Sequence, residues 1–297
     1  MRAIAVNEWG GRDKLELIER EPPPVAPDGV LLRIRAAALN PVDYKMREGR
    51  LADRFPFHFP VILGWDAAGV VEQVGPAVTW FKPGDAAYGY CRRHELEFGT
   101  YAEYVSVPEG YLAHMPEGLS FEEAAALPLA GLTAHQGLEI LGLRGGEYLF
   151  VTGGAGGVGH LVVQLAVARG ARVVATASPA NHDFLRERWR AYTGGAGADA
   201  AFDIFGGDGV EQAFTVMRKG ARLVSVAAPP PPRESIESRY EYVRPSGYDL
   251  GEHITPLVEE GSLRPHIQQT FPLERAAEAM ELLEGGHVRG KLVLTID

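Results

Sequence analysis

One segment of the sequence has the residue types and spacing of a phosphate-binding loop. The loop has six residues in the pattern GxGxxG: Gly154, Ala155, Gly156, Gly157, Val158 and Gly159. It follows a predicted strand, 147–152, and opens a predicted amphipathic helix, 158–169, which is the context in which this pattern binds dinucleotides. Glycines let the backbone approach a pyrophosphate, whose charge is favoured at a helix N-terminus. We expect a dinucleotide here; the alternative is a purely structural turn.

The residues after the next predicted strand, 172–176, indicate which nicotinamide cofactor is bound. An NAD site has an Asp or Glu about 20 residues beyond the loop, where it binds the ribose 2′-hydroxyl. In this sequence the first carboxylate is Asp183, already inside a predicted helix. A 2′-phosphate therefore meets no repulsion, and Ser178 and Asn181 can donate hydrogen bonds to it. The sequence favours NADPH, and Ser178 and Asn181 equally fit an ordinary helix start.

Composition and charge exclude several classes of protein. The chain has 297 residues, 46% of them hydrophobic, which is enough for one large or two modest domains. A net charge of −10 offers no excess of basic residues for nucleic acid. Cys91 is the only cysteine, so disulfides within the chain and cysteine-based zinc lobes are excluded. The sequence has no signal-peptide pattern and no run of 18 apolar residues, so we expect a soluble, cytoplasmic protein without a membrane partner.

Two different patterns of predicted secondary structure indicate two domains in an α/β fold. Residues 1–118 contain alternating strand patterns, such as 30–37, and glycines spaced through apolar runs, which indicate a β-rich domain. Residues 119–260 begin with a capping box at Ser120 and then alternate strands and helices, which predicts a doubly wound parallel sheet. Residues 261–297 again contain short predicted strands, with one helix between them, and we expect this segment to complete the first domain. Beyond residue 146 the expected strands are 147–152, 172–176, 200–205, 222–226, 267–271 and 291–295, and the helices include 158–169, 210–217 and 273–283.

Six further motifs accompany the glycine loop in a fixed order. They are ALNPVDYK at 38–45, GWDAAGVV at 64–71, GD at 84–85, GTYAEY at 99–104, AGLTA at 130–134 and RGKLVL at 289–294. With these motifs the sequence resembles the zinc-independent branch of the medium-chain dehydrogenase/reductase superfamily, of the quinone oxidoreductase or alkenal/enone reductase type to which zeta-crystallin belongs. The resemblance covers nearly the whole chain. It implies a GroES-like catalytic domain beside a Rossmann domain that binds NADP.

The resemblance also implies a site without metal. Zinc enzymes of the superfamily have Cys where this sequence has Asn40, and His-Glu where it has Trp65-Asp66. These replacements do not supply a tetrahedral zinc set, so we expect no metal. The same resemblance suggests Thr133 as a contact of the nicotinamide ribose, or else as an ordinary helix residue, and Lys291 as a cofactor-binding residue. A homodimer is a further expectation from the family.

One part of the sequence departs from the family pattern. Relatives have another strand between the helix that begins near His182 and the strand 200–205. In this sequence the segment 188–195 is followed almost at once by Ala198, which leaves too few residues for that strand. We therefore expect a strand–helix pair to be missing. In the strand order 3-2-1-4-5-6 the lost strand is strand 3, which lies at the sheet edge. Its loss breaks one ladder of hydrogen bonds rather than two, so we expect a sheet of five strands.

The resemblance places three hydrogen-bond donors, Asn40, Tyr44 and Lys45, at the active site. When hydride is transferred to a quinone or an enone, negative charge builds on the carbonyl oxygen, and a donor in a dry site stabilises it. The amide, the phenol and the ammonium are all candidates for this role, and Lys45 is also a candidate for contact with the cofactor. The alternatives are a turn residue for Asn40, a core residue for Tyr44 and a solvated surface charge for Lys45.

These observations lead to one preferred function and two alternatives. We expect an NADPH-dependent, metal-free reductase of a small quinone or α,β-unsaturated carbonyl compound. A non-catalytic NADPH-binding protein is the second hypothesis, motivated by the missing strand. A zinc alcohol dehydrogenase is the third, and it predicts bound metal.

Overall fold

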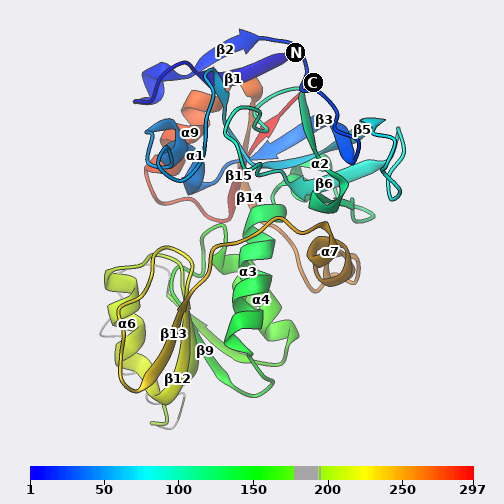
Figure 1. The fold of residues 1–297 in the computed structure, drawn as a ribbon. Coiled ribbons are helices and arrows are strands. Elements are labelled where there is room, and N and C mark those ends of the chain that lie inside the picture. The colour runs from blue at the N-terminus through cyan, green and yellow to red at the C-terminus, as the bar shows by residue number, and fades with distance from the viewer. Residues whose placement is uncertain (177–192, 194) are drawn as a thin grey trace. The chain divides into compact units, whose positions relative to one another are not determined.

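The chain folds into two compact units. The computed structural model describes residues 1–176, 193 and 195–297 (Figure 1). Unit 1 consists of Met1–Leu129, Pro245–Glu259 and Pro265–Asp297. Unit 2 consists of Ala130–Arg244 and Glu260–Arg264. Ser178 and Asn181 lie outside the described residues.

Unit 1 is built on two sheets. The larger sheet has the strand order β14-β15-β3-β5-β6-β8, with β7 also paired to β3, and every pair is antiparallel except β14 with β15. The smaller sheet has the order β2-β1-β4. The strands are β1 (Arg2–Val6), β2 (Glu16–Glu19), β3 (Gly29–Ala38), β4 (Val61–Ile62), β5 (Asp66–Val74), β6 (Ala86–Tyr90), β7 (Tyr104–Pro108), β8 (Leu112–His114), β14 (Ile267–Pro272) and β15 (Lys291–Thr295).

The C-terminal tail completes unit 1 from Pro265 onward, four residues later than the sequence predicts, because Glu260–Arg264 belong to unit 2. β15 lies between β3 and β14 in the larger sheet. It pairs with β3 in the antiparallel direction, with Val293 opposite Ala38, and with β14 in the parallel direction. The helical segments of this unit are η1 (Arg12–Lys14), α1 (Pro41–Arg47), η2 (Glu109–Tyr111), α2 (Phe121–Ala125), α7 (Gly247–Asp249), the π-helical η4 (Leu250–Ile254), α8 (Thr255–Glu259), η5 (Leu273–Arg275) and α9 (Ala276–Glu284).

The division into units differs from the sequence-based boundaries at two further segments, 119–129 and 245–259. The Ser120 hydroxyl caps α2 by accepting the Glu123 N–H at 3.2 Å, and α2 packs on β3, β5 and β15 of the antiparallel sheet. The segment that begins at α7 packs against β8, and the Tyr88 hydroxyl donates to the Leu250 carbonyl at 3.3 Å. Both segments therefore belong to unit 1, because their partners are strands of that unit.

Unit 2 is a parallel sheet with helices. Its strand order is β10-β9-β11-β12-β13, and all four pairs are parallel. This order corresponds to 2-1-4-5-6 of the six-stranded pattern, so the described residues contain five strands, the number that the sequence predicts, and none that corresponds to strand 3. The elements are α3 (Pro128–Leu141), β9 (Tyr148–Val151), α4 (Gly159–Ala168), β10 (Arg172–Ala175), β11 (Ala198–Asp203), α6 (Asp208–Val216), β12 (Met217–Ser225) and β13 (Ile236–Tyr240).

The apolar stripe of α4 is buried as the helical periodicity predicts. Leu161, Val162, Leu165 and Ala166 are all buried, and α4 packs against β9 and β10. β9 is a continuous apolar run that lies between two parallel neighbours, which is typical of a central strand. Together these contacts fix the loop that joins β9 to α4.

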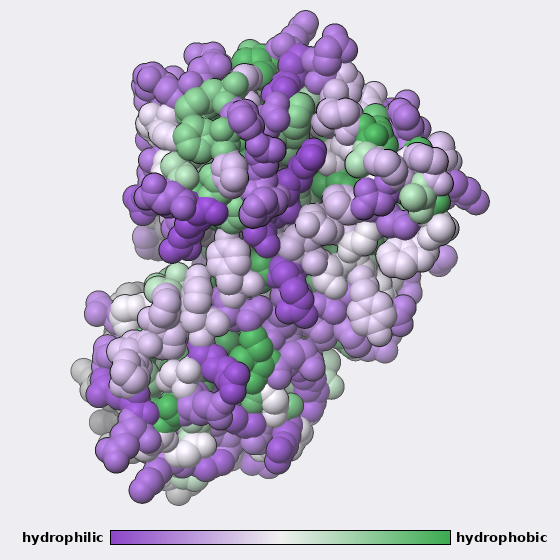
Figure 2. Space-filling view, in the orientation of Figure 1, coloured by the Kyte–Doolittle hydropathy of each residue, from purple (hydrophilic) through white to green (hydrophobic). Residues whose placement is uncertain are grey.

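Most large apolar side chains are inside the units. Figure 2 shows a face that is mainly hydrophilic, on which apolar residues gather in small separate groups. Within the described residues, no helix combines the length and the apolar character that crossing a bilayer requires.

Candidate active site

The loop between β9 and α4 has the close packing that its glycines permit. A Cβ atom on Gly159 would lie 2.1 Å from the Gly153 carbonyl oxygen, and one on Gly154 would lie 2.3 Å from the Cβ of Ala175. The Gly154 N–H donates to the Thr176 carbonyl at 2.8 Å, and the Gly153 N–H donates to the Thr176 hydroxyl at 3.2 Å. The first glycine therefore allows the loop to contact the end of β10, and the third allows α4 to approach β9.

The middle of the loop is open for a ligand. A Cβ atom on Gly156 would meet only the Gly153 carbonyl oxygen, at an ordinary 3.5 Å. Within the part of the chain that the structure describes, the amides of Ala155, Gly157 and Val158 donate to no protein acceptor. Free amides at the N-terminal end of α4 provide the donors that a pyrophosphate requires.

A buried carboxylate organises the adjoining strand ends. Asp203, at the end of β11, accepts hydrogen bonds from the Thr152 hydroxyl at 3.0 Å, the Ser225 hydroxyl at 2.7 Å and the Gly206 N–H at 2.8 Å. Asp203 is fully buried. It therefore links the carboxyl ends of β9, β11 and β12, and Thr152 is the residue directly before the glycine-rich turn. Parallel sheets bind ligands at this edge.

The remaining residues predicted to bind the cofactor have different surroundings. Thr133 is buried as the sixth residue of α3, and its contact with the cofactor stays a prediction. Lys291 is buried at the start of β15 in unit 1, and its ammonium donates to the Leu39 carbonyl at 2.9 Å and to Asn40 Oδ1 at 2.6 Å. With these bonds made inside unit 1, the Lys291 ammonium holds the chain around Asn40 in place.

Asn40 is the centre of a buried polar network in unit 1. Its Oδ1 accepts from Lys291, and its Nδ2 donates to Asp66 Oδ2 at 2.8 Å and, more weakly, to the Ala38 carbonyl at 3.4 Å. The second Asp66 oxygen accepts the Leu129 N–H at 2.8 Å, and Lys291 Nζ lies 3.5 Å from Asp66 Oδ2. Both ends of the Asn40 amide are therefore engaged within the protein.

Burial acts on both charges of this network. It raises the pKa of Asp66 and lowers the pKa of Lys291, because each charged form loses hydration. The attraction between the two groups opposes both shifts. The pair is stabilised by hydrogen bonds to Asn40, Leu39 and Leu129, as a buried ion pair requires.

Asp43 forms a second buried carboxyl site beside the first. Its Oδ2 accepts the Asn40 N–H at 2.7 Å and the Tyr101 hydroxyl at 2.8 Å, and its Oδ1 is buried without a hydrogen-bonding partner among the described residues. Burial raises the pKa of Asp43 to about 7, against the lowering effect of those two hydrogen bonds. Asp43 therefore holds a proton over much of the acidic range, and the unpartnered oxygen is the natural position for it.

Replacement of Asp43 by asparagine is expected to flatten the dependence of stability on pH. In the wild type the unfolded chain loses this proton near pH 4, but the folded chain keeps it until about pH 7. The contribution of Asp43 to stability is therefore fully present below pH 4 and is lost between pH 4 and 7, at on the order of 1 kcal/mol per pH unit. Asp43→Asn resembles the protonated form and should remove that slope.

Urea unfolding at several pH values measures this effect as the difference between the two proteins, so that other titrating groups cancel. Tyr101→Phe is the companion variant, because it removes one hydrogen bond to the carboxylate without removing the titrating group. Parallel stability curves for wild type and Asp43→Asn between pH 4 and 7 would contradict the assignment.

Tyr44 and Lys45 lie on the same helix as Asp43 and are half-buried. Within the described residues, neither the Tyr44 hydroxyl nor the Lys45 ammonium has a hydrogen-bonding partner. Burial lowers the pKa of Lys45, and Arg50 lowers it further. Burial raises the pKa of Tyr44. Of the three predicted donors, Asn40 therefore already makes hydrogen bonds with both ends of its amide. Tyr44 and Lys45, on α1, have side chains without a hydrogen-bonding partner among the described residues.

The sequence analysis missed Asp43 and Tyr101 as parts of the network, and Lys291 as its cation. Asp43 follows a helix-capping position and Tyr101 lies in a strand-like pattern, so local sequence gave each an ordinary role. The signal that was available is the charged Asp66 within the apolar run that forms the start of β5. An isolated acid in a buried strand requires a buried partner.

An antiparallel unit completed by the C-terminal tail, joined to a parallel sheet with a GxGxxG loop, defines a nucleotide-dependent dehydrogenase of two units. Family models agree with this class. Residues 26–117 match the alcohol dehydrogenase GroES-like domain, and residues 169–294 match a domain described as zinc-binding dehydrogenase.

Comparison with individual proteins extends the similarity to the whole chain. The chain is 36% identical to the 2-methylene-furan-3-one reductase of Solanum lycopersicum and to the chloroplastic NADPH-dependent alkenal/one oxidoreductase of Arabidopsis thaliana, in each case over 99% of this chain and 79% of the relative. It is similar to the structure of the quinone oxidoreductase from Coxiella burnetii, with a TM-score of 0.84 and 32% identity, over 100% of this chain and 99% of that one. The chain therefore belongs to the medium-chain dehydrogenase/reductase superfamily, to its quinone and alkenal oxidoreductase type.

Proposed function

We propose that this oxidoreductase uses NADPH to reduce a quinone or the carbon–carbon double bond of an α,β-unsaturated carbonyl compound. The observation that carries the proposal is the open glycine-rich loop, with free amides at the start of α4, in a chain of this family. The relative from Arabidopsis thaliana is named for NADPH and for alkenals and alkenones, which supports the same cofactor and substrate class here.

The cofactor is proposed to bind at the loop through main-chain groups. The amides of Ala155, Gly157 and Val158 would hold its pyrophosphate, with Gly154, Gly156 and Gly159 allowing the close approach. At the end of β10 the described residues are Ala175 and Thr176, so no carboxylate opposes a 2′-phosphate there. Ser178 and Asn181 stay predicted donors to that phosphate. When bound, NADPH supplies a hydride to the substrate.

The catalytic groups are proposed to be Lys45 and Tyr44. Negative charge on the substrate's oxygen requires a hydrogen-bond donor, and a proton must then be delivered. The half-buried Lys45 ammonium is a stronger acid than a solvated lysine, because its pKa is lowered. Tyr44 can donate a hydrogen bond beside it. Asn40 acts through its contacts with Asp66 and Lys291, since its own amide is engaged.

A reaction without metal is proposed from the donor set around Asn40. Asn40 Oδ1 and Asp66 Oδ2 already contact one cation, the Lys291 ammonium, at 2.6 and 3.5 Å. Zinc prefers cysteine sulfur and histidine nitrogen, and in this sequence Asn40, Trp65 and Asp66 stand at the ligand positions of the zinc relatives. The Lys291 ammonium thus supplies the positive charge that balances Asp66.

Gly156→Ala is expected to raise the Kd for NADPH roughly tenfold or more, because the added methyl group keeps the backbone away from the pyrophosphate. Its Cβ has room in the protein itself, so the melting temperature should hardly change. Calorimetry gives the affinity, and Gly110→Ala is the matched control, since Gly110 also has open space but lies in unit 1. Unchanged NADPH affinity in Gly156→Ala would remove this loop from the cofactor site.

The partner is proposed to be a small molecule, and cytoplasmic location and a homodimer stay predictions from the sequence and the family. Oxidation of NADPH in the presence of 1,4-benzoquinone, 9,10-phenanthrenequinone and a short enal tests the function directly. We expect turnover with at least one of them. NADPH binding without turnover would favour the non-catalytic alternative, and turnover that depends on added zinc would favour the alcohol dehydrogenase alternative.

A further inference from the structure

The C-terminal end of α1 fixes the backbone of Arg50 against that of Lys45. The Arg50 N–H donates to the Lys45 carbonyl at 2.9 Å, and the Gly49 N–H donates to the Met46 carbonyl at 2.8 Å. Gly49 has a positive φ of 77°. These are the two bonds and the left-handed glycine of a Schellman motif, which closes a helix and reverses the chain. Arg50 is therefore held next to the last turn of α1, which contains Lys45.

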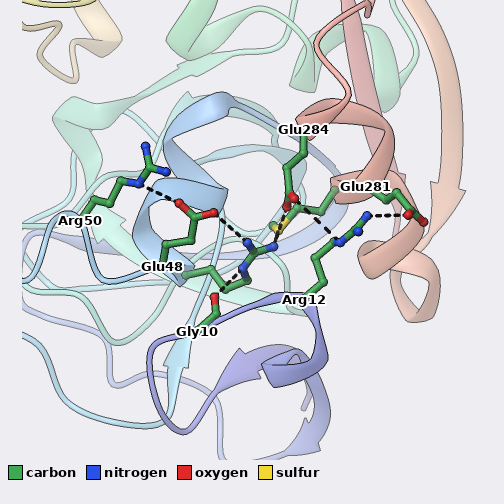
Figure 3. Close-up of polar contacts among 8 residues, drawn as sticks. Gly10, Arg12, Glu48, Arg50, Glu281 and Glu284 are labelled. Atoms are coloured by element: carbon green, nitrogen blue, oxygen red, sulfur yellow. Dashed lines mark hydrogen bonds and ion pairs between the residues drawn. The ribbon is translucent and has the colours of Figure 1, made fainter.

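Glu48 forms an ion pair with the side chain of Arg50 (Figure 3). Glu48 Oε2 lies 2.8 Å from Arg50 Nε, and Glu48 Oε1 accepts from Arg47 Nη2 at 3.2 Å. The Arg50 side chain is 62% exposed, so it would otherwise sample many rotamers in water. Glu48 is thus a link between one exposed guanidinium, Arg50, and one that is buried, Arg47.

Arg47 anchors this link to two distant parts of the chain. Its guanidinium is 2% exposed and donates to the Gly10 carbonyl at 3.0 Å, to Glu284 Oε1 at 2.6 Å and to the Met280 sulfur at 3.2 Å. Gly10 belongs to the N-terminal segment, and Met280 and Glu284 belong to α9. The position of Glu48, and with it that of Arg50, is therefore fixed by contacts within unit 1.

Among the described residues, three acidic groups on or beside α1 and α9 already have partners. Glu48 and Glu284 are both paired with Arg47, and Asp43 lies in the buried network with Asn40 and Tyr101. Besides burial, Arg50 is the charged group that lowers the pKa of Lys45. The chain Arg47–Glu48–Arg50 thus keeps a like charge close to the Lys45 ammonium.

We propose that Glu48 and Arg50 are positioning residues that hold a guanidinium beside Lys45 and so promote proton transfer from its ammonium. This inference rests on the proposed function of Lys45. In the step, an N–H bond of the ammonium breaks and a bond to hydrogen forms on the enolate or quinol oxyanion that hydride addition leaves. Lys45 becomes a neutral amine and recovers its proton from water. A neighbouring cation favours the neutral amine and makes the ammonium a better acid near neutral pH.

Arg50→Gln tests the proposal through the pH dependence of kcat. Activity should decline at alkaline pH as Lys45 loses its proton, and the midpoint of that decline should move upward by about 0.5 pH unit in Arg50→Gln. Glu48→Gln should move it by less than Arg50→Gln does, because release of Arg50 raises the midpoint and loss of the neighbouring carboxylate lowers it. Arg50→Lys keeps the charge and should retain the wild-type profile. Arg239→Gln is the matched control: Arg239 is 63% exposed, is paired with Glu237 at 2.7 Å, and lies in unit 2.

A second readout separates this proposal from the proposed function. The Lys45 titration can be followed by NMR with ¹³Cε-labelled lysine, and the resonance can be assigned as the one absent from Lys45→Arg. An upward shift in Arg50→Gln supports the proposal independently of activity. An unchanged titration midpoint in both Arg50→Gln and Glu48→Gln overturns it, even if Lys45 proves essential. Full activity of Lys45→Met overturns the catalytic role of Lys45, whatever the titration shows.

Discussion

Lys45→Met is expected to lower kcat for reduction of an enal by about 10²- to 10³-fold, with the Kd for NADPH unchanged. General acid catalysis by a positioned side chain typically contributes 10²- to 10⁴-fold, and water can replace part of it. Methionine keeps the length and apolar stem of the half-buried lysine but has no proton to give. Stopped-flow kinetics with saturating NADPH measures the loss at the chemical step.

The same variant decides between the two roles that the sequence leaves open for Lys45. If Lys45 binds the phosphate or ribose of the cofactor, Lys45→Met should weaken NADPH binding and leave kcat at saturation nearly intact. Tyr44→Phe is the companion variant, because it removes a neighbouring donor without removing a charge. A kcat within twofold of wild type in Lys45→Met would rule out the lysine as the proton donor.

The second large effect is expected on stability, from Glu284→Ala. Glu284 accepts the shortest hydrogen bond of the buried Arg47 guanidinium, at 2.6 Å. Removal of one partner from a buried ion pair leaves an uncompensated charge and typically costs 3–5 kcal/mol. We expect the lower end, about 3 kcal/mol, because Glu284 is itself 25% exposed and Glu48 still contacts Arg47. Urea unfolding measures the change in the free energy of unfolding.

Glu281→Ala is the control for this prediction, on the same helix. Glu281 pairs with Arg12 at 2.8 Å (Figure 3), but the Glu281 side chain is 67% exposed and that of Arg12 is 37% exposed. Exposed ion pairs contribute about 0–1 kcal/mol, so this variant should hardly change stability. Hydrogen exchange at the amides of α1 should accelerate in Glu284→Ala and stay unchanged in Glu281→Ala. Equal stability losses in the two variants would contradict the assignment of Arg47 as a buried anchor.

The sequence predicted those elements whose pattern repeats locally. The last strand, 291–295, is found at the predicted residues, and α4 begins and ends within one residue of its prediction. Edge strand β13 was missed because it has only five residues, of which only Ile236 and Tyr240 are apolar, so the apolar signal is weak. The four prolines before it, 229–232, lie in the connection from β12, as a stiff loop would.

The site was less predictable, because its polar groups meet through tertiary contacts. Lys291 and Asn40 are 251 positions apart in the sequence, and only the pairing of β15 with β3 brings them together. The sequence treated Asn40 as a free donor, since nothing local indicates that Asp66 and Lys291 occupy both ends of its amide. The glycine-rich loop was predicted from a local feature, a glycine pattern between a strand and a helix, and Lys45 from the motif that carries the family resemblance; both stay predictions as site residues.

The most direct test of the account is transfer of deuterium from NADPH to an enal. The protein would be incubated with a chelator and with NADPH labelled with deuterium at C4, one stereoisomer at a time, and the product analysed by mass spectrometry and NMR. The account predicts that one stereoisomer delivers its deuterium to the β-carbon of the enal at the full rate, chelator or not. No label in the product of any enal together with no oxidation of NADPH by any quinone, or label only after zinc is added back, would contradict it.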